Sequence, residues 1–282
     1  MQPPPPLSPG GRTAFRIALI AAAAVLAVGT LVSLGTVAWG VASFRVITES
    51  KPLPAGMRSV VVDTGSVPIA IRITTDRDAR QPRADLRMIN SIRAGANPLV
   101  VNTDAAGARV TINGESSPFL HWVRAGEINL VLPPDVARTL TVTAQQDTGV
   151  VLAQADIDQL IAHTDTGAVV LSGSARRIEV HNEDGEVVTR DPIRVTESFS
   201  ASTETGDIKV DFAETAPRTV DATSEDGDVV IALPAGGPYV VNANTDDGSA
   251  EVRVPQTANR EDAAAVVTAR SDTGDVTIDR LR

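Results

Sequence analysis

A short turn motif recurs along this sequence and constrains the fold more than any other feature. Its members share an acidic residue that is followed two positions later by glycine. Four copies have the sequence Asp-Thr-Gly and end at Gly65, Gly149, Gly167 and Gly274. Four variants keep the acidic residue and the glycine, and they end at Gly185, Gly206, Gly227 and Gly248. From residue 149 to residue 248 these glycines recur every 18 or 21 residues, which indicates an internal structural repeat.

The residues on both sides of each turn alternate between apolar and polar types. Around Gly227, for example, the apolar positions are Val220, Ala222, Val229 and Ile231, and the residues between them are mostly polar. Alternation with a period of two is typical of strands that have one buried face. Glycine supplies the positive φ that a tight turn requires, and the acidic side chain can accept backbone N–H groups. Each repeat therefore predicts one strand–turn–strand unit.

Units of this kind are compatible with two all-β architectures. In a β-solenoid each unit of about 21 residues is one rung, stacked in parallel on the next. In the alternative, the units form a series of antiparallel β-hairpins. Recurrence of the same residue class at the same offset, with alanine at one inward position, favours the solenoid. A degenerate copy of the motif at Asp104–Gly107 extends the series, whereas residues 72–125 fit the repeat poorly.

The N-terminal region predicts a membrane anchor. Residues 17–44 contain no charge, and a hydrocarbon core needs about 20 apolar residues for a helical span. Arg12 and Arg16 precede this segment, so the positive-inside rule places residues 1–16 in the cytoplasm as a disordered tail. The rival interpretation is a signal peptide cleaved near Val41-Ala42-Ser43. We expect residues 45–57 to be a linker and residues 58–282 to form an extracytoplasmic domain.

The overall composition excludes several classes of function. The chain has no cysteine, which rules out disulfides, thiolate metal sites and a cysteine nucleophile. Its net charge of -10 argues against nucleic-acid binding, because phosphate contacts need a positive surface. No glycine-rich phosphate loop, dinucleotide fingerprint or Ser/His/Asp array is present. We therefore predict a protein that is not an enzyme, without catalytic residues and without a bound cofactor.

The Asp63-Thr64-Gly65 turn also resembles the catalytic turn of aspartic proteases, in which two such turns share one proton. Catalysis of that kind needs two opposed turns that hold their carboxyl groups accurately. Here the turn recurs throughout the chain, and several copies replace Asp with Glu. We therefore interpret Asp63 as a turn residue.

Carboxylates gather at the turns in the C-terminal half of the chain. If rungs stack in sequence order, these carboxylates form a ladder that Ca²⁺, an ion preferring 6–8 oxygen ligands, could neutralise. The alternative is a solvated acidic edge whose side chains cap their own turns. The candidate Ca²⁺ ligands are Glu183, Asp184, Glu204, Asp207, Glu225, Asp226, Asp228, Asp246 and Asp247.

Two of the three histidines occupy equivalent positions in neighbouring repeats. His163 and His181 both lie four residues before a repeat glycine, so we expect them to stack on the outer face. A two-histidine metal site is conceivable, but the sequence offers no evident third ligand. His121 belongs to the aromatic segment SSPFLHWVRAG, residues 116–126, which is either a partner contact or an edge of the solenoid.

The repeat, the single N-terminal membrane segment and stretches such as INLVLPPDVARTLTVTAQQDTGVV (residues 128–151) resemble a known family. It is the bacterial β-strand-repeat family called "putative adhesin", a domain of unknown function, and the resemblance covers about residues 58–282. It implies a membrane-anchored solenoid on the outer side of a membrane, with no catalytic residues to carry over. We expect an adhesin-like binding or structural protein of the envelope that contacts polysaccharide or protein. The alternative is an envelope sensor or regulator that acts through an inner-membrane partner.

Overall fold

The computed structural model describes residues 44–91, 97–104, 106–113 and 126–281. Residues 46–282 form one compact unit, to which this description applies. The predicted tail, nearly all of the predicted membrane segment and the aromatic segment around His121 lie outside the described residues. Among the residues that are described, no helix is long and apolar enough to cross a membrane.

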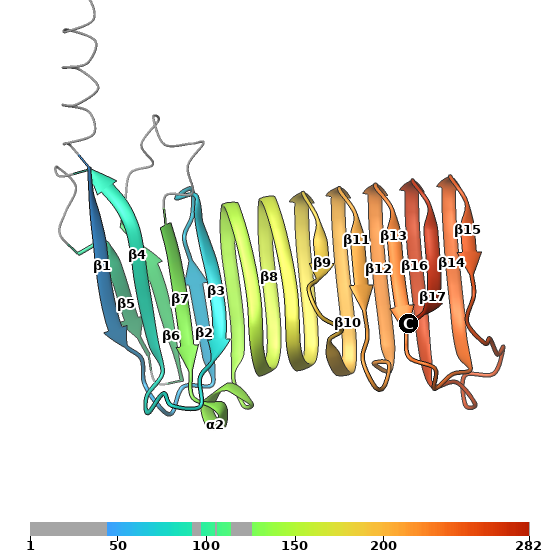
Figure 1. Ribbon diagram of the computed structural model, residues 1–282, viewed down its shortest axis with the longest axis horizontal. Helices are drawn as coiled ribbons and strands as arrows, with labels where there is room; N and C mark the ends of the chain where they lie inside the picture. The colour runs from blue at the N-terminus through green and yellow to red at the C-terminus, as the bar shows by residue number, and fades with distance from the viewer. Residues whose placement is uncertain (1–43, 92–96, 105, 114–125, 282) are drawn as a thin grey trace, which may run out of the picture. The chain divides into compact units, whose positions relative to one another are not determined.

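The described chain is mainly β-strand with one short helix, as the repeat predicts (Figure 1). The N-terminal strands are β1 (Phe44–Pro52), β2 (Ser59–Asp63), β3 (Ile69–Thr75), β4 (Arg83–Ser91), β5 (Leu99–Thr103), β6 (Gly107–Ile112) and β7 (Gly126–Leu132). A short helix, α2 (Pro134–Ala137), separates them from the long strand β8 (Thr141–Asp184). The remaining strands are β9 (Val187–Thr189), β10 (Arg194–Thr205), β11 (Ile208–Asp211), β12 (Thr219–Asp226), β13 (Val229–Leu233), β14 (Tyr239–Asp247), β15 (Ala250–Val252), β16 (Ala265–Thr273) and β17 (Val276–Arg280).

Strands of neighbouring repeats pair in parallel and in register through the C-terminal part. Phe199 in β10 pairs with Ile178 in β8 on one side and with Val220 in β12 on the other. Beyond the turn, Ile208 in β11 pairs with Val187 in β9 and with Val229 in β13. Equivalent residues of the repeat therefore stack on one another. The antiparallel-hairpin alternative is wrong for this part of the chain.

The rungs do not stack in sequence order at the C-terminal end. The last rung, β16–β17, pairs with β12–β13 on one side and with β14–β15 on the other. It is thus inserted between two rungs that precede it in the sequence, and β14–β15 is the terminal rung (Figure 1). The expected stacking of each unit on the next is wrong at this point.

The N-terminal end shows the same kind of insertion. Strands β2 and β3 pair in parallel with β8 on one side and with β6 and β7 on the other. Beyond this rung the pairing becomes antiparallel, between β4 and β7 and between β5 and β6. Strand β1 pairs with β4. Residues 72–125, which fit the repeat poorly, thus supply most of a cap with a different geometry.

Two sequence-based assignments change in this region. Gly107 is not a repeat glycine, because it begins β6 and pairs with Ser59, well before the turn at Gly65. Between the end of β5 and the start of β6, the Asp104 carboxylate instead accepts the N–H groups of Ala106 and Gly107. The expected linker 45–57 is also part of the folded body. It contains most of β1, and Ile47, Leu53 and Met57 are buried.

The core is a narrow column of aliphatic side chains between the two strands of each rung. The inward residues Val220, Ala222, Val229 and Ile231 are almost completely buried, and their counterparts in the neighbouring rungs are as well. The core also holds Phe199 and Phe212, whose rings meet edge to face with centroids 5.3 Å apart. This packing confirms the inward assignment that the alternation predicted.

Candidate interaction surface

The repeat glycines stack on one another along one edge of the rungs, which we call the glycine edge. Gly227 has φ 154°, and an added Cβ would lie 2.2 Å from the carbonyl oxygen of Gly206 in the next rung. At Gly167 the same distance to Gly149 is 1.7 Å. Real Cβ atoms do not approach oxygen so closely, and other residues rarely adopt this φ. From Gly149 to Gly274 the glycines are thus required by contact between rungs as well as by the turn, whereas an added Cβ at Gly65 would meet nothing within 4 Å.

A column of buried and half-buried polar side chains lies just beneath the glycine edge, three residues before the repeat glycines from Gly149 to Gly274. Five of them donate to the carbonyl oxygen of the repeat glycine in the adjacent rung, whereas Gln146 and Thr164 have no side-chain hydrogen-bond partner among the described residues. The donor–acceptor distances are 2.9 Å from Ser224 to Gly206 and 2.8 Å from Ser271 to Gly227. Asn182, Thr203 and Thr245 make the equivalent bonds. The column satisfies carbonyl groups that the tight turns leave unpaired.

Aspartates directly after the repeat glycines form a second ladder. The Asp207 carboxylate accepts the backbone N–H of Asp228 at 2.9 Å, and the Asp228 carboxylate accepts that of Asp275 at 2.9 Å. Asp275 in turn accepts the N–H and the hydroxyl of Ser249, each at 2.9 Å. Lys209 and the Asp228 N–H lower the pKa of Asp207, and Ser249 lowers the pKa of Asp275. These carboxylates are therefore committed to holding neighbouring turns together.

The other predicted Ca²⁺ ligands are exposed at the glycine edge. Which of these carboxylates are neighbours depends on which rungs pair, and not on their order in the sequence. Asp246 lies beside Arg270, which also pairs with Asp272 of the inserted rung. The expected contact of Asp246 and Asp247 with Glu225 and Asp226 is therefore wrong. Within the described residues, no group of three or more His, Cys, Asp or Glu side chains is placed to hold a metal ion.

Asp63 behaves as a turn residue at the start of this series. One of its carboxylate oxygens accepts the N–H of Gly65 at 3.1 Å, and the other lies 3.2 Å from Arg109. The carboxylate of an aspartic protease shares a proton with a second aspartate, whereas Asp63 faces a cation. The structure thus gives Asp63 the role of capping its own turn.

His163 and His181 are brought together, as their equivalent positions predicted. Both belong to β8, and their ring centroids lie 6.2 Å apart at an angle of 61° between the ring planes. The Nδ1 atom of His181 lies 2.8 Å from the hydroxyl of Ser202 in β10. His181 is exposed and His163 is half-buried, so both rings lie on the outer side of the strands.

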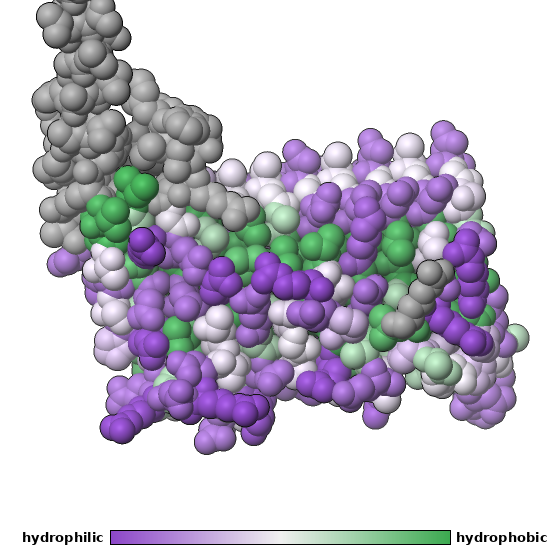
Figure 2. All heavy atoms as spheres, in the orientation of Figure 1, coloured by the Kyte–Doolittle hydropathy of each residue, from purple (hydrophilic) through white to green (hydrophobic). Residues whose placement is uncertain are grey.

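The outward residues of the long strands make a regular polar surface, which we call the polar face. Its two columns are built from rungs that pair in register, one from Glu179 to Asn242 and the other from His181 to Asn244. Figure 2 displays one side of the molecule, with rows of hydrophilic side chains separated by a hydrophobic band. The first column is Glu179, Ser200, Asp221, Thr268 and Asn242, and the second is His181, Ser202, Thr223, Arg270 and Asn244.

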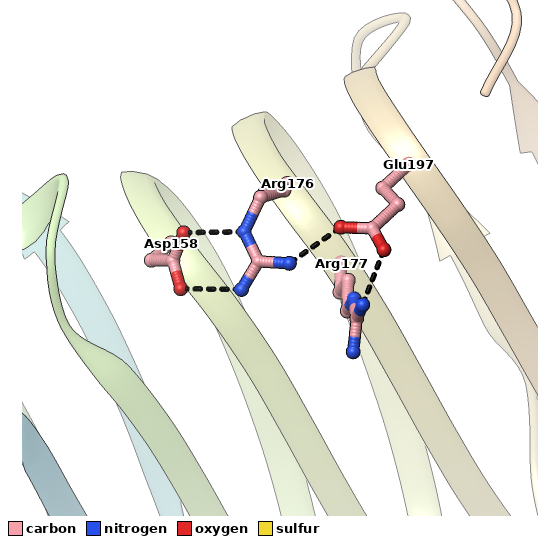
Figure 3. Close-up of polar contacts among 4 residues, drawn as sticks. All are labelled: Asp158, Arg176, Arg177 and Glu197. Carbon is pink, nitrogen blue, oxygen red and sulfur yellow. Dashed lines mark hydrogen bonds and ion pairs between the residues drawn. The ribbon is translucent and has the colours of Figure 1, made fainter. Parts of the chain in front are cut away.

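An ion-pair network links three rungs near the opposite end of the long strands (Figure 3). Arg176 contacts both oxygens of Asp158, at 2.8 and 2.9 Å, and also Glu197 of the next rung at 2.5 Å. The second oxygen of Glu197 contacts Arg177. The register between β10 and β8 shifts between Val195 and Ser198, and Glu197 lies within this irregularity. Arg177 and Arg176 lower the pKa of Glu197 from 4.5 to about 2.

Fold and surface together define an all-β repeat protein whose exposed features are ladders of polar side chains. The chain belongs to the Toastrack DUF4097 family, whose model matches residues 125–280. This result confirms the family resemblance inferred from the repeat. No curated protein sequence matches the chain.

Solved structures similar to this chain come from several bacteria. A "putative adhesin" from Parabacteroides merdae is 10% identical, covers 84% of this chain and 97% of its own, and has a TM-score of 0.46. A "putative adhesin" from Bacteroides fragilis is 15% identical with the same coverage and a TM-score of 0.44. A "putative cell adhesion protein" from Clostridium sporogenes is 10% identical, covers 84% of this chain and 100% of its own, and has a TM-score of 0.41.

Two features of the surface escaped the sequence analysis. The buried polar column was missed, although the alternation that places Val220 and Ala222 inside also places Ser224 inside. The ion-pair network was missed because Arg176 and Arg177 lie outside the regular part of the repeat. Only the first feature had a usable sequence signal, which was a polar residue three positions before every repeat glycine from Gly149 onward.

Proposed function

We propose that this protein is an adhesin-like, non-catalytic binding protein of the bacterial envelope. In this proposal residues 17–44 anchor it in the inner membrane, the N-terminus is cytoplasmic, and the rungs form a β-solenoid on the outer side. The observation that carries the proposal is the polar face, which repeats hydroxyl, amide and charged side chains in register across successive rungs.

A regular polar surface on a parallel stack suits contact with another polymer. Neighbouring strands lie about 4.8 Å apart, so equivalent side chains are presented at that spacing along the stack. Within the second column, the contact of His181 with Ser202 and the ion pair of Arg270 with Asp246 restrain side chains before any partner arrives. This restraint reduces the conformational entropy that binding must overcome. Hydroxyl and amide groups suit hydrogen bonding to polysaccharide or to a protein surface.

The test combines surface exposure with capture of partners. Protease added to intact cells that carry the full chain should degrade the body while the membrane remains closed. The tagged full-length chain should then capture an envelope polysaccharide or surface protein after cross-linking. The double variant Ser200→Lys/Thr268→Lys should lose this capture, because both changes alter the polar face.

The matched control is Ala232→Lys/Thr277→Lys, which changes outward residues of the shorter strands β13 and β17. It should bind as the wild type does. Equal binding by all three proteins would remove the polar face from the proposal. Capture of an inner-membrane signalling protein alone would replace adhesion with the regulatory alternative.

A further inference from the structure

The pair of histidines on the outer side of β8 offers chemistry that the polar face does not otherwise contain. His163 and His181 lie in adjacent rungs, with ring centroids 6.2 Å apart. Their rings are accessible, because His181 is exposed and His163 is half-buried. Neighbouring parallel strands hold the two backbones about 4.8 Å apart, so the pair cannot separate without disrupting the stack.

The contacts of His181 match those of a metal-binding histidine. Its Nδ1 lies 2.8 Å from the Ser202 hydroxyl, and in the tautomer in which Nδ1–H donates to that oxygen, Nε2 is the atom that can bind a metal ion. Metal-bound histidines characteristically use their second ring nitrogen for a hydrogen bond of this kind. For His163, no hydrogen bond is found within the part of the chain that the structure describes, so its ring can turn toward its neighbour.

The distance between the rings is close to what a shared ion requires. Zinc–imidazole bonds are about 2.0–2.1 Å long, so two imidazoles on one ion have ring centres roughly 5 Å apart. A modest rotation of the His163 side chain covers the difference from 6.2 Å. The His163 side chain is half-buried rather than buried, so it can change rotamer on the outer side of the strand without backbone movement.

We propose that His163 and His181 form a two-imidazole site for a divalent first-row transition metal ion. Imidazole nitrogen suits Cu²⁺, Ni²⁺ and Zn²⁺, and the stability order of divalent ions places Cu²⁺ first. Ca²⁺ and Mg²⁺ are disfavoured because they prefer oxygen ligands. Its two ligands differ from the carboxylates predicted as Ca²⁺ ligands, although one of those, Glu183, lies two residues from His181. The site does not depend on the adhesin-like function.

The remaining coordination positions would hold water. Carboxylates flank the pair on the same side of the strands, two residues from each histidine, at Asp165, Glu179 and Glu183. Their side chains are exposed, and no described group of three donors is arranged to hold an ion. These carboxylates therefore add negative potential near the ion, and the site stays open and exchangeable.

The test is titration of the full chain with CuCl₂, followed by calorimetry and by electron paramagnetic resonance of the bound ion. The wild type should bind one Cu²⁺ with a spectrum that shows two imidazole nitrogens. His163→Gln and His181→Gln should each weaken binding at least about tenfold and leave one nitrogen in the spectrum. His121→Gln, which removes the one other histidine, is the matched control and should bind as the wild type does.

A further variant tests the role assigned to Ser202. Ser202→Ala should weaken binding by about tenfold or more while keeping both nitrogens in the spectrum, because it removes only the hydrogen bond to His181. Circular dichroism and melting should be unchanged in all four variants. Equal Cu²⁺ binding by the wild type and the His163→Gln/His181→Gln double variant would overturn the proposal, as would a loss of binding in His121→Gln.

Discussion

The two ends of the stack are closed in different ways. At the N-terminal end, β4 and β5 pair antiparallel to the last parallel rung, and Leu86 and Leu99 on these strands are fully buried. At the C-terminal end, the inward residues Val241 and Ala243 of β14 remain half-exposed. A change of strand direction thus seals one end, whereas the other end keeps the repeat geometry up to its last rung.

The difference shows that a stack of parallel rungs needs a separate structural feature to close each end. Every rung offers the backbone groups and apolar column that another rung would accept, so an open edge invites association. The C-terminal end limits this with polar side chains, since Asn242, Asn244 and Asp246 are exposed on β14. The chain after β15 adds a local cover, because Pro255 and Thr257 pair with the backbone of Tyr239.

The largest loss of stability is expected at the glycine edge, where an interior rung can be compared with the terminal rung. In Gly227→Val the new side chain would meet the Gly206 carbonyl at 2.2 Å in the middle of the stack, so unfolding free energy should fall by about 3–5 kcal/mol. Gly248→Val makes an equally short contact in the terminal rung. Because that rung can shift toward solvent, the loss of unfolding free energy should be smaller. Urea denaturation measures both. Equal losses would mean that the terminal rung is as constrained as the interior.

The second test compares core residues at the two ends. Leu86→Ala removes a fully buried side chain beneath the N-terminal cap and should destabilise the protein by about 2–5 kcal/mol. Val241→Ala removes a half-exposed side chain at the C-terminal end and should cost less than about 1 kcal/mol. Thermal melting of both variants provides the measurement. A larger loss for Val241→Ala would show that something covers the C-terminal end in solution.

The smallest effect is expected from the ion-pair network, which lies away from both ends. Because the folded state lowers the Glu197 pKa from 4.5 to about 2, the contribution of Glu197 is complete above about pH 4.5 and disappears as the pH falls toward 2. Glu197→Gln should lower Tm by no more than about 2 °C at pH 7. The difference from wild type should vanish near pH 2. A difference that stays constant with pH would assign the effect of the variant to packing rather than charge.

Particular residues illustrate how far sequence reasoning reached. The alternation around Gly227 identified the inward Val220 and Ala222, and the equal offsets of His163 and His181 predicted their contact. The same reasoning failed at Gly107, where a glycine of similar spacing serves an antiparallel turn. It also treated residues 45–57 as a linker, because the two prolines and the glycine concealed a strand that pairs with the distant β4.

The sequence by itself determined the repeating unit: strands of period two, glycine corners, and a core of valine, isoleucine and alanine. Those features follow from local stereochemistry and from the burial of alternate side chains. Only the tertiary structure decided which rung lies beside which. Because the repeat rungs share similar inward columns and a glycine corner, each is an acceptable neighbour for another. The insertion of β2–β3 and of β16–β17 one place from the ends is therefore invisible in the repeat.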